Sequence, residues 1–167
     1  MAVGIQLALI AVLLGVNALL AGSEVALISL REAQIARLEE RGARGRAVAT
    51  LARDPNRFLA TIQIGITLSG FLASATAAVS LAEPLVPLFG PLGAAARPLA
   101  VVLVTAVLTF VTLVLGELAP KRIAMQRAEG WALAAGGVLV ALARVSGPAV
   151  SLLGVSTDLV VRLTGAD

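Results

Sequence analysis

The chain has 167 residues, of which 59% are hydrophobic and 14% charged, and its mean hydropathy is +0.98. This balance is typical of an integral membrane protein and excludes an ordinary soluble domain of this length. The sequence contains no cysteine and no histidine, which excludes disulfides, zinc-type sites and catalysis by a thiolate or an imidazole, so an enzyme is not expected. The oxygen ligands that remain suit Mg²⁺, Ca²⁺, Na⁺ or protons. The 13 basic residues are clustered, which indicates a lipid bilayer as the partner and no nucleic acid.

Three segments are long and apolar enough to span a bilayer, which predicts an all-α integral membrane fold. They cover about residues 3–30, 55–81 and 99–120. The first carries no charge between Val3 and Gly22. A cleaved signal peptide is the alternative for this segment, although no basic stretch precedes its apolar run. The second begins at Asp54-Pro55, an N-cap residue followed by proline at the first helical position.

Basic residues are distributed unevenly among the connections between these spans. Ten lie either in residues 31–57 or just after the third span, and only Arg97 lies between the second and third spans. Because cytoplasmic loops carry the excess of Lys and Arg, this predicts a multi-pass protein of the cell membrane with its N-terminus outside and its basic connections in the cytoplasm. Residues 31–54 show apolar positions at helical spacing with a break at Gly42, which predicts a cytoplasmic helix hairpin.

Residues 130–163 allow two interpretations. The apolar stretch that starts at Trp131 ends at Arg144, and Gly147-Pro148 then interrupts any helix. We expect a kinked juxtamembrane helix that lies at the cytoplasmic interface, with Trp131 as its aromatic anchor. A fourth span is the alternative, and the two interpretations place Asp167 on opposite sides of the membrane.

Glu117 is a carboxylate near the end of the third span, within Gly116-Glu117-Leu118-Ala119-Pro120-Lys121. A carboxylate at the end of a membrane helix is costly and indicates an ion or proton site inside a bundle. Because Pro120 has no N–H, we expect a helix break there that leaves the carbonyl of Gly116 without its helical partner. The alternative is an ion pair between Glu117 and Lys121 at the membrane edge.

The other two spans also contain polar residues. Those near the end of the first span are Asn17, Ser23 and Glu24. Those on two adjacent stripes of the second span are Gln63, Thr67, Gly70 and Ser74, and Gly65, Ser69 and Thr76. Ordinary helix packing explains most of the hydroxyls, and an interfacial ion pair with Arg31 is the alternative for Glu24. In an antiparallel bundle, however, Glu117, Ser69 and Ser23 would meet at about one depth as an oxygen cage for a small cation.

Three motifs carry a resemblance to a known family. They are Gly22-Ser23-Glu24-Val25-Ala26-Leu27, then Thr61-Ile62-Gln63-Ile64-Gly65-Ile66-Thr67-Leu68-Ser69-Gly70, then Gly116-Glu117-Leu118-Ala119-Pro120-Lys121-Arg122. In this order and spacing they resemble the transmembrane domain of the CorC and cyclin M (CNNM) family of magnesium transporters. The resemblance covers nearly the whole chain.

The resemblance implies a homodimer with three transmembrane helices per protomer, a cytoplasmic helix pair between the first two and a belt-like juxtamembrane helix after the third. It implies export of Mg²⁺ in exchange for Na⁺. Glu117 would be the acidic ligand, Ser69 and Ser23 would supply hydroxyl oxygens, and a backbone carbonyl near Gly65 or Gly116 would complete the site. Weaker candidates, for positions around the metal or for a Na⁺ site, are Asn17, Glu24, Gln63, Thr67 and Gly70.

Full-length family members continue into paired regulatory modules that bind adenine nucleotides, and this sequence ends at Asp167 without such a stretch. We therefore expect a trimmed membrane domain, with a naturally short member as the alternative. Two other functions stay open from the residues alone. One is a membrane anchor and dimerisation scaffold for the missing domains, and the other is a Na⁺ or proton carrier that uses Glu117.

Overall fold

A computed structural model describes residues 2–165, and within this range the chain forms helices joined by short turns, with no β-strand. The all-α class predicted from the sequence is confirmed. Four described segments are long and apolar enough to cross a membrane: Val3–Ser29, Pro55–Ser80, Glu83–Gln126 and Ala128–Val145. The predicted count of three spans is not confirmed, since the fourth segment also meets these criteria, and it stays a prediction.

The chain forms two compact units, each made of two stretches of sequence. The first unit contains the described residues up to Gly22 together with Ile66–Ile123. The second unit contains Ser23–Gly65 together with the described residues from Ala124 onward. Helices α1 (Ala2–Ser29), α4 (Pro55–Ser80) and α6 (Ala119–Gln126) contribute to both units, because each division falls inside a helix.

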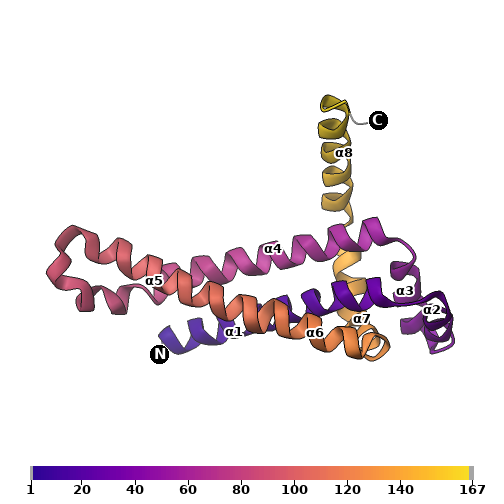
Figure 1. The fold of residues 1–167 in the computed structure, drawn as a ribbon, viewed down its shortest axis with the longest axis horizontal. Helices are drawn as coiled ribbons and strands as arrows, with labels where there is room; N and C mark the ends of the chain where they lie inside the picture. The colour runs from indigo at the N-terminus through magenta and orange to yellow at the C-terminus, as the bar shows by residue number, and fades with distance from the viewer. Residues whose placement is uncertain (1, 166–167) are drawn as a thin grey trace. The chain divides into compact units, whose positions relative to one another are not determined.

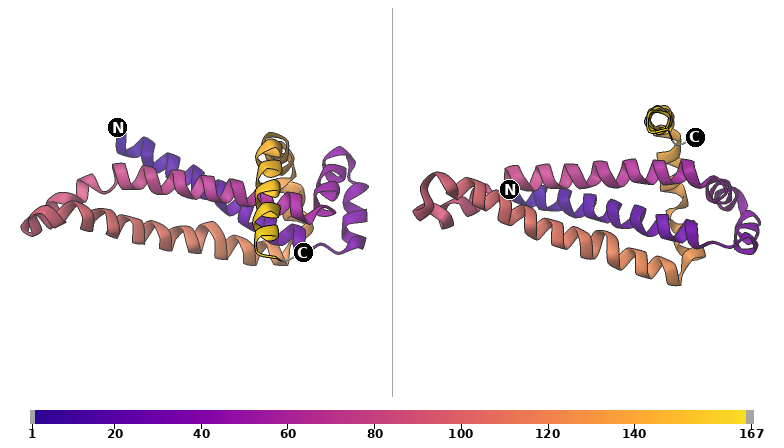
Figure 2. Two further views of the ribbon diagram at one scale, coloured as in Figure 1. Left: turned by 90° about the horizontal axis from the view of Figure 1, so that it is seen from above. Right: turned by 45° about the horizontal axis from the view of Figure 1, so that its top comes forward.

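In the first unit, α1 up to Gly22 and α4 from Ile66 onward run alongside α5 (Ala96–Val111), as both Figure 1 and Figure 2 show. The buried centre of this packing is formed by Ile10, Ala77, Ala82, Ala100 and Val104. Small side chains at three of these five positions let the helices approach closely, as is common where membrane helices pack. Large apolar side chains such as Phe71 and Phe110 remain exposed, 71% and 69%, as expected for surfaces that face lipid.

The connection between α4 and α5 consists of 3₁₀ turns, η1 (Glu83–Ala95). Prolines 87 and 91 lie inside it and cannot donate backbone hydrogen bonds, which disfavours a regular α-helix. Gly93 interrupts the turns with φ +55°, a conformation that favours glycine. Glu83 and Arg97 form an exposed ion pair of 2.7 Å across this connection.

The third predicted span does not break at Pro120. It continues from α5 through a π-helical stretch, η2 (Thr112–Leu118), into α6 (Ala119–Gln126). The backbone N–H of Ala119 bonds to the carbonyl of Val114, five residues back, so the wider turn lies directly before the proline. The missing donor at Pro120 is accommodated by widening the preceding turn rather than by ending the helix.

The second unit contains α2 (Glu32–Glu39), α3 (Gly42–Ala52), α7 (Ala128–Val145) and α8 (Gly147–Leu163). The turn between α2 and α3 requires φ +86° at Gly42. Gly45 lies against α2 so closely that a Cβ there would come within 1.9 Å of the carbonyl oxygen of Leu38. The residues between the first two spans therefore form two short packed helices, whereas their predicted cytoplasmic location stays a prediction.

Charged side chains join the elements of the second unit. Arg53 donates hydrogen bonds to Glu39 and, at 2.8 Å, to Glu32, and these bonds raise the pKa of Arg53 above its ordinary value. Arg37 of α2 pairs with Glu129 of α7 at 2.6 Å. Helix α7 ends at Val145 and α8 starts at Gly147, so the bend falls where Gly147-Pro148 interrupts the sequence pattern.

Candidate cation site

Asn17 on α1 and Gly116 on η2 form a hydrogen bond within the first unit. The Nδ2 atom of Asn17 donates to the carbonyl oxygen of Gly116 over 3.0 Å, and Asn17 is only 2% exposed. A Cβ at position 116 would lie 3.2 Å from this Nδ2 atom and 2.8 Å from Cδ1 of Leu14. Glycine therefore leaves room for the amide to reach the carbonyl, whose normal helical donor is absent because residue 120 is proline.

Ser69 on α4 bonds to the other end of the same amide. Its Oγ donates to Oδ1 of Asn17 over 3.2 Å, and the carbonyl of Ile66 lies 3.1 Å from the same hydroxyl. A hydroxyl has a single hydrogen, so Ser69 donates to one of these acceptors at a time. The side chain of Asn17 thus connects α1, α4 and η2.

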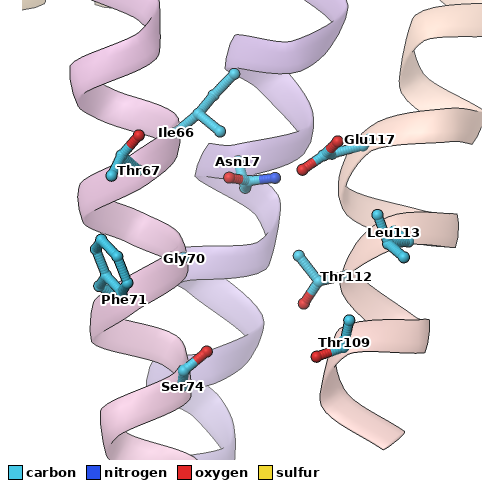
Figure 3. Close-up of a pocket in the computed structure, with 10 residues that line it drawn as sticks. All are labelled: Asn17, Ile66, Thr67, Gly70, Phe71, Ser74, Thr109, Thr112, Leu113 and Glu117. Carbon is cyan, nitrogen blue, oxygen red and sulfur yellow. The ribbon is translucent and has the colours of Figure 1, made fainter. Parts of the chain in front are cut away.

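A pocket of about 310 Å³ opens next to Asn17, and Figure 3 shows the residues that line it. They are Asn17, Ile66, Thr67, Gly70, Phe71, Ser74, Thr109, Thr112, Leu113 and Glu117. Glu117 is the only ionisable side chain among these described lining residues. In Figure 3 its carboxylate and the amide of Asn17 point toward each other. One carboxylate, one amide and four hydroxyl groups therefore share a single pocket.

The π-helical turn explains how residues 112 and 117 reach the same pocket. Five residues of a regular α-helix would turn their side chains about 140° apart. The hydrogen bond from the N–H of Ala119 to the carbonyl of Val114 reaches five residues back, one more than in an α-helix. This wider turn changes the angle about the helix axis between the side chains of Thr112 and Glu117. Both side chains line the pocket. The widened turn before Pro120 is therefore part of the construction of the site.

The structure places the predicted site residues in three groups. The residues that line the pocket are Asn17, Thr67, Gly70 and Glu117. Ser69 and Gly116 contact Asn17 through hydrogen bonds and are both buried. The residues that belong to the second unit and do not line this pocket are Ser23, Glu24, Gly65 and Gln63. Ser23 is fully buried, Glu24 and Gly65 are half-buried, and Gln63 is exposed.

Sequence reasoning missed two pocket residues, Thr109 and Thr112. They are hydroxyl residues within the apolar third span, and their spacing of three residues places them on one helical face. That spacing could have indicated a polar face. An α-helical projection, however, separates Thr112 from Glu117, and the sequence did not predict the π-helical turn that brings both to the pocket.

The chemistry of the lining limits what the pocket can bind. Within residues 2–165, no group of three or more acidic side chains could hold a metal ion. One carboxylate with neutral oxygens cannot balance the charge of a divalent ion, so such an ion would keep part of its water shell, as Mg²⁺ usually does. A monovalent cation would be balanced by Glu117 alone. The pocket is therefore suited to a hard cation that prefers oxygen ligands rather than to zinc or copper.

Apolar helices of spanning length, with a pocket among them that carries a carboxylate, an amide and hydroxyl groups, define a helical membrane domain. The family model described as the cyclin M transmembrane N-terminal domain (CNNM) matches residues 8–166, and the chain belongs to this family. The resemblance to the CorC and cyclin M family is thereby confirmed.

Curated relatives agree with this assignment. A UPF0053 protein of Synechocystis is 42% identical over 170 residues, which cover 98% of this chain and 37% of that protein. The UPF0053 protein YhdP of Bacillus subtilis is 29% identical over 98% of this chain and 38% of its own length. The UPF0053 inner membrane protein YfjD of Escherichia coli is 31% identical over 90% of this chain and 33% of its own length. The chain thus spans 33% to 38% of the length of these three relatives.

Proposed function

We propose that this membrane domain transports Mg²⁺ and that Glu117 provides the charged ligand for the ion. The observation that carries the proposal is the pocket of about 310 Å³ that Glu117 lines together with an amide and four hydroxyl groups from three segments of the chain. A carboxylate within a membrane helix is costly and is kept where it has an ionic partner or a function. Exchange of Mg²⁺ for Na⁺ belongs to the same proposal, since both ions prefer oxygen ligands.

Size and hydration favour an ion that keeps some of its water. A water molecule takes about 30 Å³ in the liquid, so the pocket has room for a cation together with several waters. Mg²⁺ loses water reluctantly and is usually bound through one or two carboxylates plus waters. Thr67, Thr109 and Thr112 would accept hydrogen bonds from these waters or replace some of them.

Asn17 would determine how many oxygen atoms of the protein coordinate the ion. The carbonyl of Gly116 and the hydroxyl of Ser69, both expected as ligands, are engaged by the Asn17 amide. They would become available to a cation when the amide turns away, so Asn17 would separate a loosely coordinated state from a more tightly coordinated one. Ser23 and Gly65 remain candidate ligands on the basis of the family resemblance.

The wider setting is also part of the proposal. We expect a homodimer in the cell membrane, with the N-terminus outside and the basic connections in the cytoplasm. The name of the Escherichia coli relative describes that protein as an inner membrane protein, which supports the location. We further propose that the full-length protein carries nucleotide-binding regulatory modules, as expected from the family.

Mg²⁺ flux into proteoliposomes tests the role of the carboxylate. Glu117→Gln keeps the size of the side chain but removes its charge, and we expect it to reduce Mg²⁺ flux at least tenfold, about 1.4 kcal/mol in binding terms. Glu83→Gln is the matched control, because Glu83 is exposed and pairs with Arg97 outside the pocket. Mg²⁺ flux at the wild-type rate in Glu117→Gln would overturn the proposal.

Two measurements, of ion flux and of thermal stability, separate the alternatives. A Na⁺ or proton carrier would move those ions without moving Mg²⁺, and Glu117→Gln would abolish that movement. A membrane anchor and dimerisation scaffold would show no increase in melting temperature with millimolar Mg²⁺, whereas a domain that binds the ion is stabilised by it. Mg²⁺ flux together with thermal stabilisation supports the proposal.

A further inference from the structure

Two arginines of the second unit line one pocket, and neither forms an ion pair with an acidic residue of the described part of the chain. The pocket, of about 310 Å³, contains Arg57 from the first turn of α4 and Arg144 from the last turn of α7. Within residues 2–165 the ion pairs formed by arginine involve Arg37, Arg53 and Arg97, and neither pocket arginine is among them. Asp54 bonds to the backbone N–H of Arg57 rather than to its guanidinium.

The rest of the lining is largely apolar. It consists of Ala47, Leu51, Val140 and Ala143, together with Thr50. The hydroxyl of Thr50 donates to the carbonyl of Arg46 within its own helix. The pocket is therefore lined by two exposed arginines and a largely apolar wall, and the five donors of a guanidinium fit the oxygens of a phosphate group.

The position of the two arginines along the chain indicates the depth of the pocket. Arg57 stands at the start, and Arg144 at the end, of helices whose length and hydropathy suit a membrane span. Whether α7 crosses the membrane or lies at its surface, Arg144 terminates its apolar stretch. Arginine at such positions reaches the level of the lipid headgroups, and basic pockets between helices at this level bind anionic headgroups.

We infer that Arg57 and Arg144 bind the phosphate of an anionic phospholipid, with the glycerol and upper acyl chain against the apolar wall. A soluble phosphate would gain nothing from Leu51 and Val140, so the apolar lining favours the lipid. This site is distinct from the proposed cation pocket, which lies wholly in the first unit. Its failure would therefore leave the transport proposal intact.

Lipid retention measured by native mass spectrometry tests the inference. The chain is released from nanodiscs that contain equal amounts of phosphatidylglycerol and phosphatidylcholine, and the wild type is expected to retain phosphatidylglycerol preferentially. Arg57→Gln and Arg144→Gln are each expected to reduce this retention about fivefold. The control is Arg46→Gln, which removes an exposed charge of α3 outside the pocket and should retain the lipid as the wild type does.

Three results would overturn the inference. The first is a wild type with no preference for phosphatidylglycerol, a result that does not depend on whether any variant folds. The second is an equal loss in Arg46→Gln, which would indicate attraction to the overall charge. The third is displacement of the lipid by millimolar glycerol 3-phosphate, which would assign the site to a soluble phosphate.

If a glutamine variant does not fold, Arg57→Lys and Arg144→Lys replace it. Lysine keeps the positive charge but lacks the paired N–H donors of the guanidinium, and intermediate lipid retention is expected.

Discussion

The side-chain amide of Asn17 donates a hydrogen bond to the backbone carbonyl of Gly116, 99 positions away in the sequence. This carbonyl lies four residues before Pro120 and would lack a donor in a regular α-helix. The amide supplies that donor, and its oxygen accepts from Ser69 at the same time. One side chain therefore supplies the donor that the proline removes and also lines the pocket that contains Glu117.

Removal of the Asn17 amide should destabilise the first unit. Asn17→Leu has a similar volume but leaves the Gly116 carbonyl without its side-chain donor and removes an acceptor of Ser69. Hydrogen bonds between membrane helices contribute about 0.6 kcal/mol each on average and up to about 1.7, so we expect a loss of about 1 to 2 kcal/mol. Reversible unfolding in detergent micelles measures this loss. Asn56→Leu, at an exposed position of α4, is the control and should change stability little.

Adjacent glycines of α7 provide a matched test of its packing on α3. A Cβ at Gly136 would come within 2.5 Å of Cγ2 of Val48, whereas a Cβ at Gly137 would have no atom of the described residues within 4 Å apart from the adjoining backbone of its own helix. Val48 is fully buried and β-branched, so it cannot rotate away easily. We expect Gly136→Ala to destabilise the protein by about 1 to 3 kcal/mol.

Gly137→Ala should instead be neutral or stabilising by up to about 1 kcal/mol, since alanine favours a helix over glycine. Thermal unfolding of both variants under the same conditions gives the comparison. Equal melting temperatures for the two variants would show that α7 does not pack on Val48 in the membrane protein.

The hydroxyl of Thr112 should contribute to cation transport if the pocket is the ion site. Thr112→Val keeps the shape of the side chain and removes its oxygen, so we expect Mg²⁺ flux to fall about fivefold, as for the loss of about 1 kcal/mol of binding. Thr105→Val is the same change on the same helix, at a residue that does not line the pocket. If both variants transported Mg²⁺ equally well, the Thr112 hydroxyl would have no role in the site.

The ion pair between Arg37 and Glu129 should couple α2 to α7 only weakly. The two side chains are 58% and 23% exposed, and solvent screens such pairs. A double-mutant cycle with Arg37→Gln and Glu129→Gln is expected to give a coupling of about 0.2 to 1 kcal/mol that decreases with added salt. A coupling that is larger and insensitive to salt would indicate that the pair is shielded from water in the assembled protein.

Local features of the sequence predicted much of the helical architecture. The apolar segments predicted the all-α class, and Asp54-Pro55 predicted a helix start where α4 begins. Pro120 predicted an irregularity at the end of the third span, but its form differed: the chain widens into a π-helical turn and continues as α6. A proline in the sequence shows that one backbone N–H donor is missing. How the helix adjusts to this missing donor depends on the neighbouring helices.

The sequence by itself determined that the chain is apolar and helical, and that Glu117 is a costly carboxylate inside it. Both follow from hydropathy and charge, which are properties of short stretches. Only the tertiary structure decided that Asn17, expected as an outlying residue, joins Gly116 and Ser69, and that Thr109 and Thr112 share a pocket with Glu117. These relationships join residues 52 or more positions apart, or depend on a local change in helical rotation. They are set by how the helices rotate and pack against each other, which no short stretch of sequence contains.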